Sequence, residues 1–181
     1  MRIIRGLYKG KKIIAPGNLP VRPTTDFAKE SLFNILENNI ELQDLKILDL
    51  FSGTGNIAYE FASRQAAHIT CVDINFHCVS FIQKTMQLLG VSNVKVTKQD
   101  VFRYLKTTSE NYDMIFADPP YAMEGVSEIP GLIFDKNILN ASGWLVLEHD
   151  DNFNFSMHEK FLFHKVYGKV NFSFFQEKEI N

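Results

Sequence analysis

A run of four residues, Asp118-Pro119-Pro120-Tyr121, carries the most specific chemistry in the sequence. Consecutive prolines fix φ and remove two backbone donors, so the run is rigid and its carbonyl groups face a partner. The Asp118 carboxylate and the Pro119 carbonyl can then accept the two N–H groups of an exocyclic amine on a nucleobase. These acceptors would aim the nitrogen lone pair at a methyl donor, while Tyr121 stacks on the base. The run predicts methyl transfer to an amino group.

A glycine turn upstream is predicted to bind the methyl donor. Gly53-x-Gly55-x-x-Ala58 lies between a strand pattern and a helical one, which is the context of a nucleotide-binding turn. Glycines let the chain turn sharply, and the helix N-terminus offers free N–H groups to an anion. Asp49, just before the turn, would repel a pyrophosphate but attract the α-ammonium group of S-adenosylmethionine. The alternative for Asp49 is a structural hydrogen-bond acceptor.

Two further carboxylates follow predicted strands. Asp73 ends the second strand, 18 residues after Gly55, where it can accept hydrogen bonds from ribose hydroxyls. Asp100 follows the third strand and is placed either to take the adenine amino group or to cap a helix. The rest of the expected cofactor site is formed by residues next to these positions, namely Phe51, Ile74 and Val101. The five histidines lack metal-ligand spacing, so no metal is expected.

Strand and helix patterns alternate from Lys46 onward. Strands are expected at 46–51, 68–73, 93–97, 112–117 and 143–149, and helices near 56–65, 75–89 and 124–140, with a shorter one after Asp100. This alternation predicts right-handed crossovers and an α/β fold with a mostly parallel sheet and helices on both faces. Two more strand patterns, 161–167 and 170–176, meet at Gly168-Lys169 and predict a closing antiparallel hairpin.

The N-terminal region is the basic part of the chain. Residues 1–30 hold seven basic and two acidic side chains, a net charge of +5, against −7 for the rest. Residues 2–15 alternate around glycines and predict a small β-hairpin, and Thr24 or Thr25 can cap a helix that runs to about Asn38. A basic arm on an acidic body favours contact with a polyanion, although a merely solvated charged face remains the alternative.

Length and composition place the chain among ordinary globular proteins. Its 181 residues with 45% hydrophobic content fit a single domain, with residues 1–40 as an appendage and 41–181 as the catalytic core. No stretch reaches the roughly 18 apolar residues of a membrane span, and no signal peptide is evident. Cys71 and Cys78 fit buried positions rather than a disulfide or metal pair. We expect a cytoplasmic monomer.

Four sequence blocks together resemble a known family. DLFSGTG (Asp49 to Gly55) and DPPY (Asp118 to Tyr121) resemble the motifs of class I, S-adenosylmethionine-dependent amino-methyltransferases. The N-terminal blocks are RIIRGLYKGKKI and RPTTDFAKESLFNIL, at residues 2–13 and 22–36. They narrow the resemblance to the RsmD family, the bacterial 16S rRNA guanine-N(2)-methyltransferases. The resemblance runs nearly end to end.

This resemblance implies a Rossmann-like fold with a seven-stranded sheet and methylation of one guanine amino group in 16S rRNA. The family's substrate is an assembled or assembling 30S subunit. Carried onto this sequence, the cofactor would be lined by Asp49, Gly53, Gly55, Asp73 and Asp100, and the base held by Asp118, Pro119 and Tyr121. The RNA-facing residues would be Arg22 and Thr24 beside the base, with Arg5, Lys9, Lys11, Lys12 and Lys29. At Lys29 the family usually has Arg, and lysine lacks the bidentate fork of arginine.

Three alternative functions remain open. An adenine amino-methyltransferase acting on DNA or another RNA would share the DPPY run, but the RPT block and the lack of a separate target-recognition domain disfavour it. An NAD-dependent oxidoreductase is disfavoured by Asp49 and by DPPY. A non-catalytic RNA-binding relic would not need Gly53, Gly55 and Asp118, all of which are present.

Overall fold

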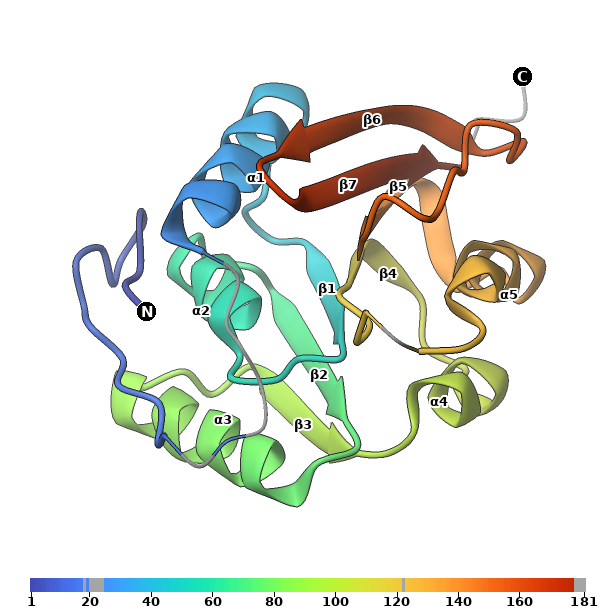
Figure 1. Cartoon of the computed structure of the whole chain (residues 1–181). Coiled ribbons are helices and arrows are strands. Elements are labelled where there is room, and N and C mark those ends of the chain that lie inside the picture. The colour runs from blue at the N-terminus through green and yellow to red at the C-terminus, as the bar shows by residue number, and fades with distance from the viewer. Residues whose placement is uncertain (18, 20–24, 122, 178–181) are drawn as a thin grey trace.

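The computed structural model describes residues 1–17, 19, 25–121 and 123–177. A seven-stranded sheet runs through the molecule in the order β3-β2-β1-β4-β5-β7-β6 (Figure 1). Its strands are β1 (Lys46–Leu50), β2 (His68–Asp73), β3 (Val94–Lys98), β4 (Tyr112–Ala117), β5 (Leu139–His149), β6 (Phe161–Tyr167) and β7 (Val170–Gln176). The first five strands pair in parallel, and β7 pairs antiparallel with both β5 and β6. The predicted mostly parallel sheet with a closing hairpin is confirmed.

Helices cover both faces of the sheet. They are α1 (Asp26–Asn39), α2 (Asn56–Ser63), α3 (Phe76–Leu89), α4 (Val101–Thr107) and α5 (Ile129–Asp135), with a short 3-10 turn at Val126–Glu128. The first three pack on one face and the last two on the other, each side with its own apolar cluster (Figure 1). No helix in the described ranges is long and apolar enough to cross a membrane.

Short polar residues fix where the helices begin. The Thr25 hydroxyl accepts a hydrogen bond from the Ala28 N–H at 3.2 Å, so Thr25 is the N-cap of α1. The Asn75 side chain accepts from the His77 N–H at 2.8 Å at the start of α3. These caps satisfy donors that the first helical turn leaves unpaired.

The segment before β5 differs from the prediction of one helix over 124–140. The chain forms the 3-10 turn and the seven-residue α5, and β5 begins already at Leu139. Asn137 and Ser142 have φ of 51° and 62°, which no helix accommodates, and the β4–β5 register shifts beside this stretch. The last apolar residues of the predicted helix are therefore part of β5. Hydrophobic periodicity alone does not distinguish a short buried strand from a helix.

The N-terminal segment forms less sheet than predicted. Its two arms meet in a single antiparallel bridge between Arg2 and Lys12 rather than in a regular hairpin. Instead the segment docks on the end of α2, where the Leu7 N–H donates to the Ser63 carbonyl at 2.8 Å. Gly6 has φ of 82°, and a Cβ there would lie 1.9 Å from the Ser63 oxygen. Only glycine permits so close an approach.

Candidate active site

Four acidic side chains follow one another along the carboxyl edge of the parallel strands. Asp73 ends β2, Asp49 lies near the end of β1, Asp118 follows β4, and Glu148 lies near the end of β5. These strands are consecutive neighbours in the order β2-β1-β4-β5, so the side chains form a row. The chain order reverses between β1 and β4, and α/β sheets bind ligands at such a switch point.

The strand register places the row on one face of the sheet. Asp49 lies opposite Phe116, two residues before Asp118, and side chains two residues apart in a strand share a face. Leu147 lies opposite Ala117, so the next residues along, Glu148 and Asp118, are neighbours on that same face. This is the face that α1, α2 and α3 cover.

Asp49 is a buried carboxylate with an unsatisfied oxygen. Its exposed fraction is 2%, and its Oδ2 has no hydrogen-bond partner in the described part of the chain. Burial raises its pKa well above the ordinary value, and the nearby charges of Asp118 and Asp73 raise it further. An ammonium group would supply both the missing donor and the missing positive charge. The site therefore fits the α-ammonium of S-adenosylmethionine.

The glycine turn is tied to β2 by Asp73. One Asp73 oxygen accepts the Gly53 N–H and the other accepts the Asn75 N–H, each at 2.7 Å. Gly53 and Gly55 have φ of 53° and 78°, and the non-glycine Phe51 beside them has φ of 58°. A left-handed bulky residue stores strain that the surrounding structure must hold, as is common beside a binding site. Each Asp73 oxygen keeps a lone pair for a ribose hydroxyl.

The expected adenine side of the site lies beyond Asp73. Ile74 is 66% exposed beside it, and Val101, the first residue of α4, is buried as a member of the apolar cluster under α4 and α5. Asp100 caps α4, because one carboxylate oxygen accepts the Arg103 N–H at 2.9 Å. Asp100 therefore acts as a helix cap. Its second carboxylate oxygen is not used by the cap, and its contact with adenine stays a prediction.

The DPPY run begins where β4 ends. Asp118 is partly buried, and desolvation raises its pKa to about 7. Pro119 is buried, while the Pro120 carbonyl accepts the Met123 N–H at 2.9 Å and closes a turn. The Tyr121 ring is 61% exposed, as a stacking surface for a base must be. The acceptor and the stacking ring are thus held next to each other on a rigid turn.

Glu148 joins this site although sequence reasoning missed it. Its exposed fraction is 4%, and Oε2 has no hydrogen-bond partner among the described residues. Burial and the charge of Asp118 raise its pKa to about 9. The available signal was an acidic residue directly after the apolar run 144–147 of a strand that ends at the same edge.

The row of carboxylates is not itself a metal centre. Within the described ranges, no group of three His, Cys, Asp or Glu side chains is arranged to hold a metal ion. A hollow of about 460 Å³ lies elsewhere, beside the N-terminal segment, and none of the four carboxylates lines it.

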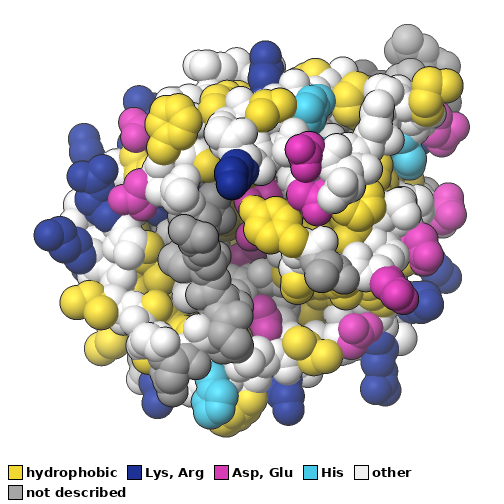
Figure 2. All heavy atoms as spheres, in the orientation of Figure 1, with side chains coloured by type: hydrophobic (Ala, Val, Ile, Leu, Met, Phe, Trp, Pro, Cys, Tyr) yellow, Lys and Arg dark blue, Asp and Glu magenta, His cyan; other side chains and the backbone are white. Residues whose placement is uncertain are grey.

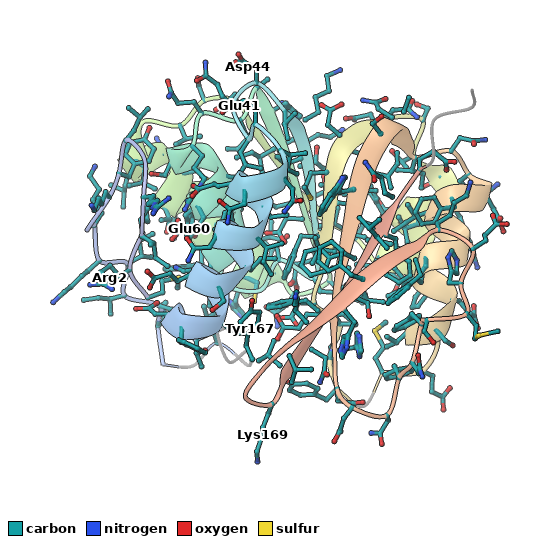
Figure 3. All side chains as sticks on the ribbon, turned by 90° about the horizontal axis from the view of Figure 1, so that it is seen from above. Arg2, Glu41, Asp44, Glu60, Tyr167 and Lys169 are labelled. Carbon is teal, nitrogen blue, oxygen red and sulfur yellow. The ribbon has the colours of Figure 1, made fainter. Side chains whose placement is uncertain are left out.

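Lys29 does not face RNA, contrary to its predicted role. Its side chain is 1% exposed, and its ammonium group donates to the Arg2 carbonyl at 2.7 Å and to Asn56 Oδ1 at 2.8 Å. It also pairs with the buried Glu60 carboxylate at 3.0 Å. Figure 3 shows Glu60 beside α1, on the side of the segment that carries Arg2. Lys29 therefore holds the N-terminal segment to α1 and α2.

The remaining predicted RNA contacts have mixed outcomes. Lys9, Lys11 and Lys12 are exposed, and Lys11 lies over the Tyr8 ring at 5.1 Å. Arg5 pairs with Glu37 at 2.6 Å while its side chain stays 58% exposed. Arg22 and Thr24 lie outside the described residues. Basic side chains gather at the left edge of Figure 2, over the N-terminal segment, while acidic ones gather on the right.

Comparison with known proteins assigns the family. A family model described as Conserved hypothetical protein 95 matches residues 1–176. The chain belongs to this family, the RsmD family. A relative in Buchnera aphidicola subsp. Baizongia pistaciae, named ribosomal RNA small subunit methyltransferase D, is 31% identical over 85% of this chain and 78% of its own length. The Escherichia coli protein of the same name is 29% identical over 98% of this chain and 90% of its own length.

Solved structures confirm the predicted class I methyltransferase fold. The yhhF methyltransferase structure from Escherichia coli superposes on this RsmD-family chain with a TM-score of 0.86 at 28% identity, covering 98% of both chains. A 16S rRNA N2 methyltransferase of T. thermophilus, in complex with AdoMet and guanosine, has a TM-score of 0.67 at 18% identity. That match covers 86% of this chain and 44% of the other, and it shows the fold alone.

Proposed function

We propose that this protein transfers a methyl group from S-adenosylmethionine to the exocyclic amine of a guanine in 16S rRNA. The observation that carries the proposal is the row of carboxylates at the switch point, in which the buried Asp49 suits a cation and the partly buried Asp118 suits an amine. Family membership supports an rRNA substrate, because the relatives are named ribosomal RNA small subunit methyltransferase D. The second candidate, an adenine amino-methyltransferase, would use the same Asp118.

The cofactor half of the site is formed by β1 and β2. Asp49 would hold the α-ammonium group and Asp73 the ribose hydroxyls, while Ile74 and Asp100 would contact the adenine. S-adenosylmethionine supplies an electrophilic methyl group on a sulfonium. Because the glycine turn is pinned to Asp73 before any ligand binds, these groups need little rearrangement.

The acceptor half is formed at the end of β4. The ionised Asp118 and the Pro119 carbonyl would each accept one N–H of the guanine amine, and Tyr121 would stack on the base. In the transfer, the amine nitrogen forms a bond to the methyl carbon as the bond from carbon to sulfur breaks. One amine proton then leaves to solvent, and S-adenosylhomocysteine is released. The base must leave its helix or already be unpaired to reach Asp118.

RNA is proposed to lie along the basic N-terminal segment. Lys9, Lys11 and Lys12 are exposed there, and Arg22 and Thr24 are proposed beside the target base. Neutralising phosphates with such side chains releases counterions and makes affinity depend on salt. The proposal further implies a cytoplasmic monomer that acts on an assembled or assembling 30S subunit.

Labelled methyl transfer tests this function. Purified protein is incubated with labelled S-adenosylmethionine and unmethylated 30S subunits, with free rRNA and DNA in parallel, and the products are digested to nucleosides. The proposal predicts label in 2-methylguanosine from the ribosomal substrate. Label in methyladenosine, or only in DNA, would favour the second candidate, and no label in any substrate would overturn both.

A further inference from the structure

Glu148 is a buried acid, and no group in the described part of the protein pairs with one of its carboxylate oxygens. Its side chain lies on the face of the sheet that carries the apolar cluster of α1, α2 and α3, and Phe172 of that cluster lies opposite it on β7. Its Oε2 is fully buried and receives no hydrogen bond from any described residue. Leaving such an acceptor unpaired is costly, so a donor from outside the protein is expected at this place.

The neighbour of Glu148 indicates which ligand would bring that donor. Asp118 lies beside it on the adjacent strand, on the same face of the sheet. No hydrogen bond within the described ranges joins the two side chains. Both pKa values are raised, that of Asp118 to about 7 and that of Glu148 to about 9, by burial, with the Asp118 charge adding to the shift at Glu148. Adjacent N–H donors would relieve this arrangement.

Guanine has adjacent donors of this kind and adenine does not. The guanine amine that Asp118 would accept is directly next to the ring N1–H, so two N–H groups point the same way. In adenine the ring nitrogen beside the amine carries no hydrogen and is itself an acceptor. In its ionised form, which adjacent N–H donors favour, Glu148 is a second acceptor next to Asp118 and therefore matches guanine and opposes adenine.

We propose that Glu148 accepts the N1–H of the target guanine and thereby selects guanine over adenine. The inference deepens the proposed function and rests on it. Asp118 positions the amine for transfer, whereas Glu148 contacts an edge of the base that does not react. Its loss should therefore change the choice of base more than the binding of the cofactor.

The test compares two RNA substrates that differ at N1. Small subunits are reconstituted with either guanosine or 2,6-diaminopurine at the mapped position, since diaminopurine keeps the 2-amino group but lacks the N1 hydrogen. Wild-type protein should prefer guanosine by roughly 100-fold or more in kcat/KM, because the analogue leaves Glu148 facing an acceptor. A third substrate with 6-thioguanosine retains the N1 hydrogen and should be methylated within a few-fold of guanosine.

Glu148→Gln then assigns the preference to this residue. The amide can accept from a guanine N1–H or donate to the bare ring nitrogen of diaminopurine, so the preference should fall below about 10-fold. Affinity for S-adenosylhomocysteine, measured by calorimetry, should stay unchanged. Glu159→Gln is the matched control, because its side chain is 82% exposed and the wild-type preference should persist.

The outcomes separate this inference from the proposed function. If wild-type protein yields methyladenosine, the proposed function fails and the inference with it. If it yields 2-methylguanosine but methylates diaminopurine as fast as guanosine, only the inference is overturned, even if Glu148→Gln fails to fold. An unchanged preference in a folded Glu148→Gln variant would also overturn it, as would a 6-thioguanosine substrate rejected as strongly as diaminopurine.

Discussion

Two clusters of charged side chains lie on the same face of the sheet, and they differ in whether the protein itself supplies the partners of those side chains. In the first, Glu60 pairs with Lys29 at 3.0 Å, pairs with Arg64, and accepts the Ile4 N–H at 2.8 Å. In the second, Asp49 and Glu148 each keep a buried oxygen with no partner in the described part of the chain. In the first cluster, residues of the protein supply the hydrogen-bond and ion-pair partners. In the second, we expect a bound ligand to supply the missing hydrogen-bond donors.

This difference separates two roles of buried charge: a charge paired within the protein supports the fold, and one left without a partner indicates a binding site. Arg64 also pairs with Glu37 at 2.6 Å and stacks over Phe33 at 4.3 Å, and Glu37 in turn holds Arg5. This network fastens the N-terminal segment to α1 and α2. Removing a member should cost stability. Removing a carboxylate of the row that repels its neighbours should instead lower ligand binding or turnover. Stability should not fall, because repulsion between these carboxylates destabilises the ligand-free protein.

The largest effect is expected for Asp118→Ala. Losing the acceptor that orients the amine should lower methyl transfer by about 100- to 1000-fold, while affinity for S-adenosylmethionine changes by less than about 3-fold. Single-turnover kinetics and calorimetry measure the two quantities. Asp118→Asn is the matched control and should lose less, since it keeps one acceptor oxygen. A variant that retains most of its turnover would remove Asp118 from the mechanism.

Glu60→Ala breaks the paired cluster instead. Two buried cations, Lys29 and Arg64, would lose their shared partner, so the free energy of unfolding should fall by about 3–5 kcal/mol. Urea denaturation followed by circular dichroism measures this change. Glu41→Ala, at an exposed position, should have almost no effect. A loss below about 1 kcal/mol at Glu60 would mean that the network does not fasten the segment.

Asp49→Asn tests whether a member of the carboxylate row contributes to cofactor binding rather than to stability. The amide keeps the shape but loses the negative charge, so affinity for S-adenosylmethionine should fall about 10- to 100-fold. The free energy of unfolding should not fall, because a buried like-charge repulsion with Asp118 and Asp73 is removed. Calorimetric titration and urea denaturation together check both statements. Wild-type affinity in this variant would assign Asp49 a purely structural role.

A pH dependence follows from the raised pKa of Asp118. The ionised carboxylate accepts an amine N–H more strongly than the neutral acid, so kcat/KM should fall as pH drops below about 7, by up to tenfold per unit until only the activity of the neutral form is left. Stability should move the other way. Because the folded-state pKa lies above the ordinary value of 3.8, the folded protein binds this proton more tightly, and Asp118 adds stability as pH falls from 7 toward 4.

Asp118→Asn provides the control for this pH profile. The variant cannot titrate at position 118, so its residual activity should lose the acidic limb attributed to that group. Rates measured from pH 5.5 to 8.5 at constant ionic strength compare the two proteins. An identical acidic limb in the variant would assign the titration to another group.

The smallest effect is expected on the exposed surface. Changing Lys9, Lys11 and Lys12 to Gln should weaken binding to ribosomal RNA and lower the slope of log affinity against log salt by up to about 2 to 3. Filter binding at several salt concentrations measures the slope. A control with Lys106 and Lys136 changed, both exposed on the other face, should keep the wild-type slope. Equal slopes in all three proteins would make the segment a solvated surface only.

Sequence reasoning found the parts of the site that are local in the chain. Asp49, the glycines and Asp118 each lie where a strand ends in a recognisable turn, and the structure brings these strand ends together. Glu148 was missed because its meaning depends on β5 lying beside β4, which is a property of strand order. The RNA-facing role of Lys29 came from the family resemblance and was wrong, because the N-terminal segment covers this side chain.

A crystal structure with S-adenosylhomocysteine and guanosine would test most directly the central claim that the row of carboxylates holds both ligands. The account predicts the ammonium nitrogen within about 3.2 Å of an Asp49 oxygen and the guanine amine at the same distance from Asp118. It also predicts ribose hydroxyls at Asp73. Ligands that bind elsewhere, without contacting Asp49 or Asp118, would contradict it.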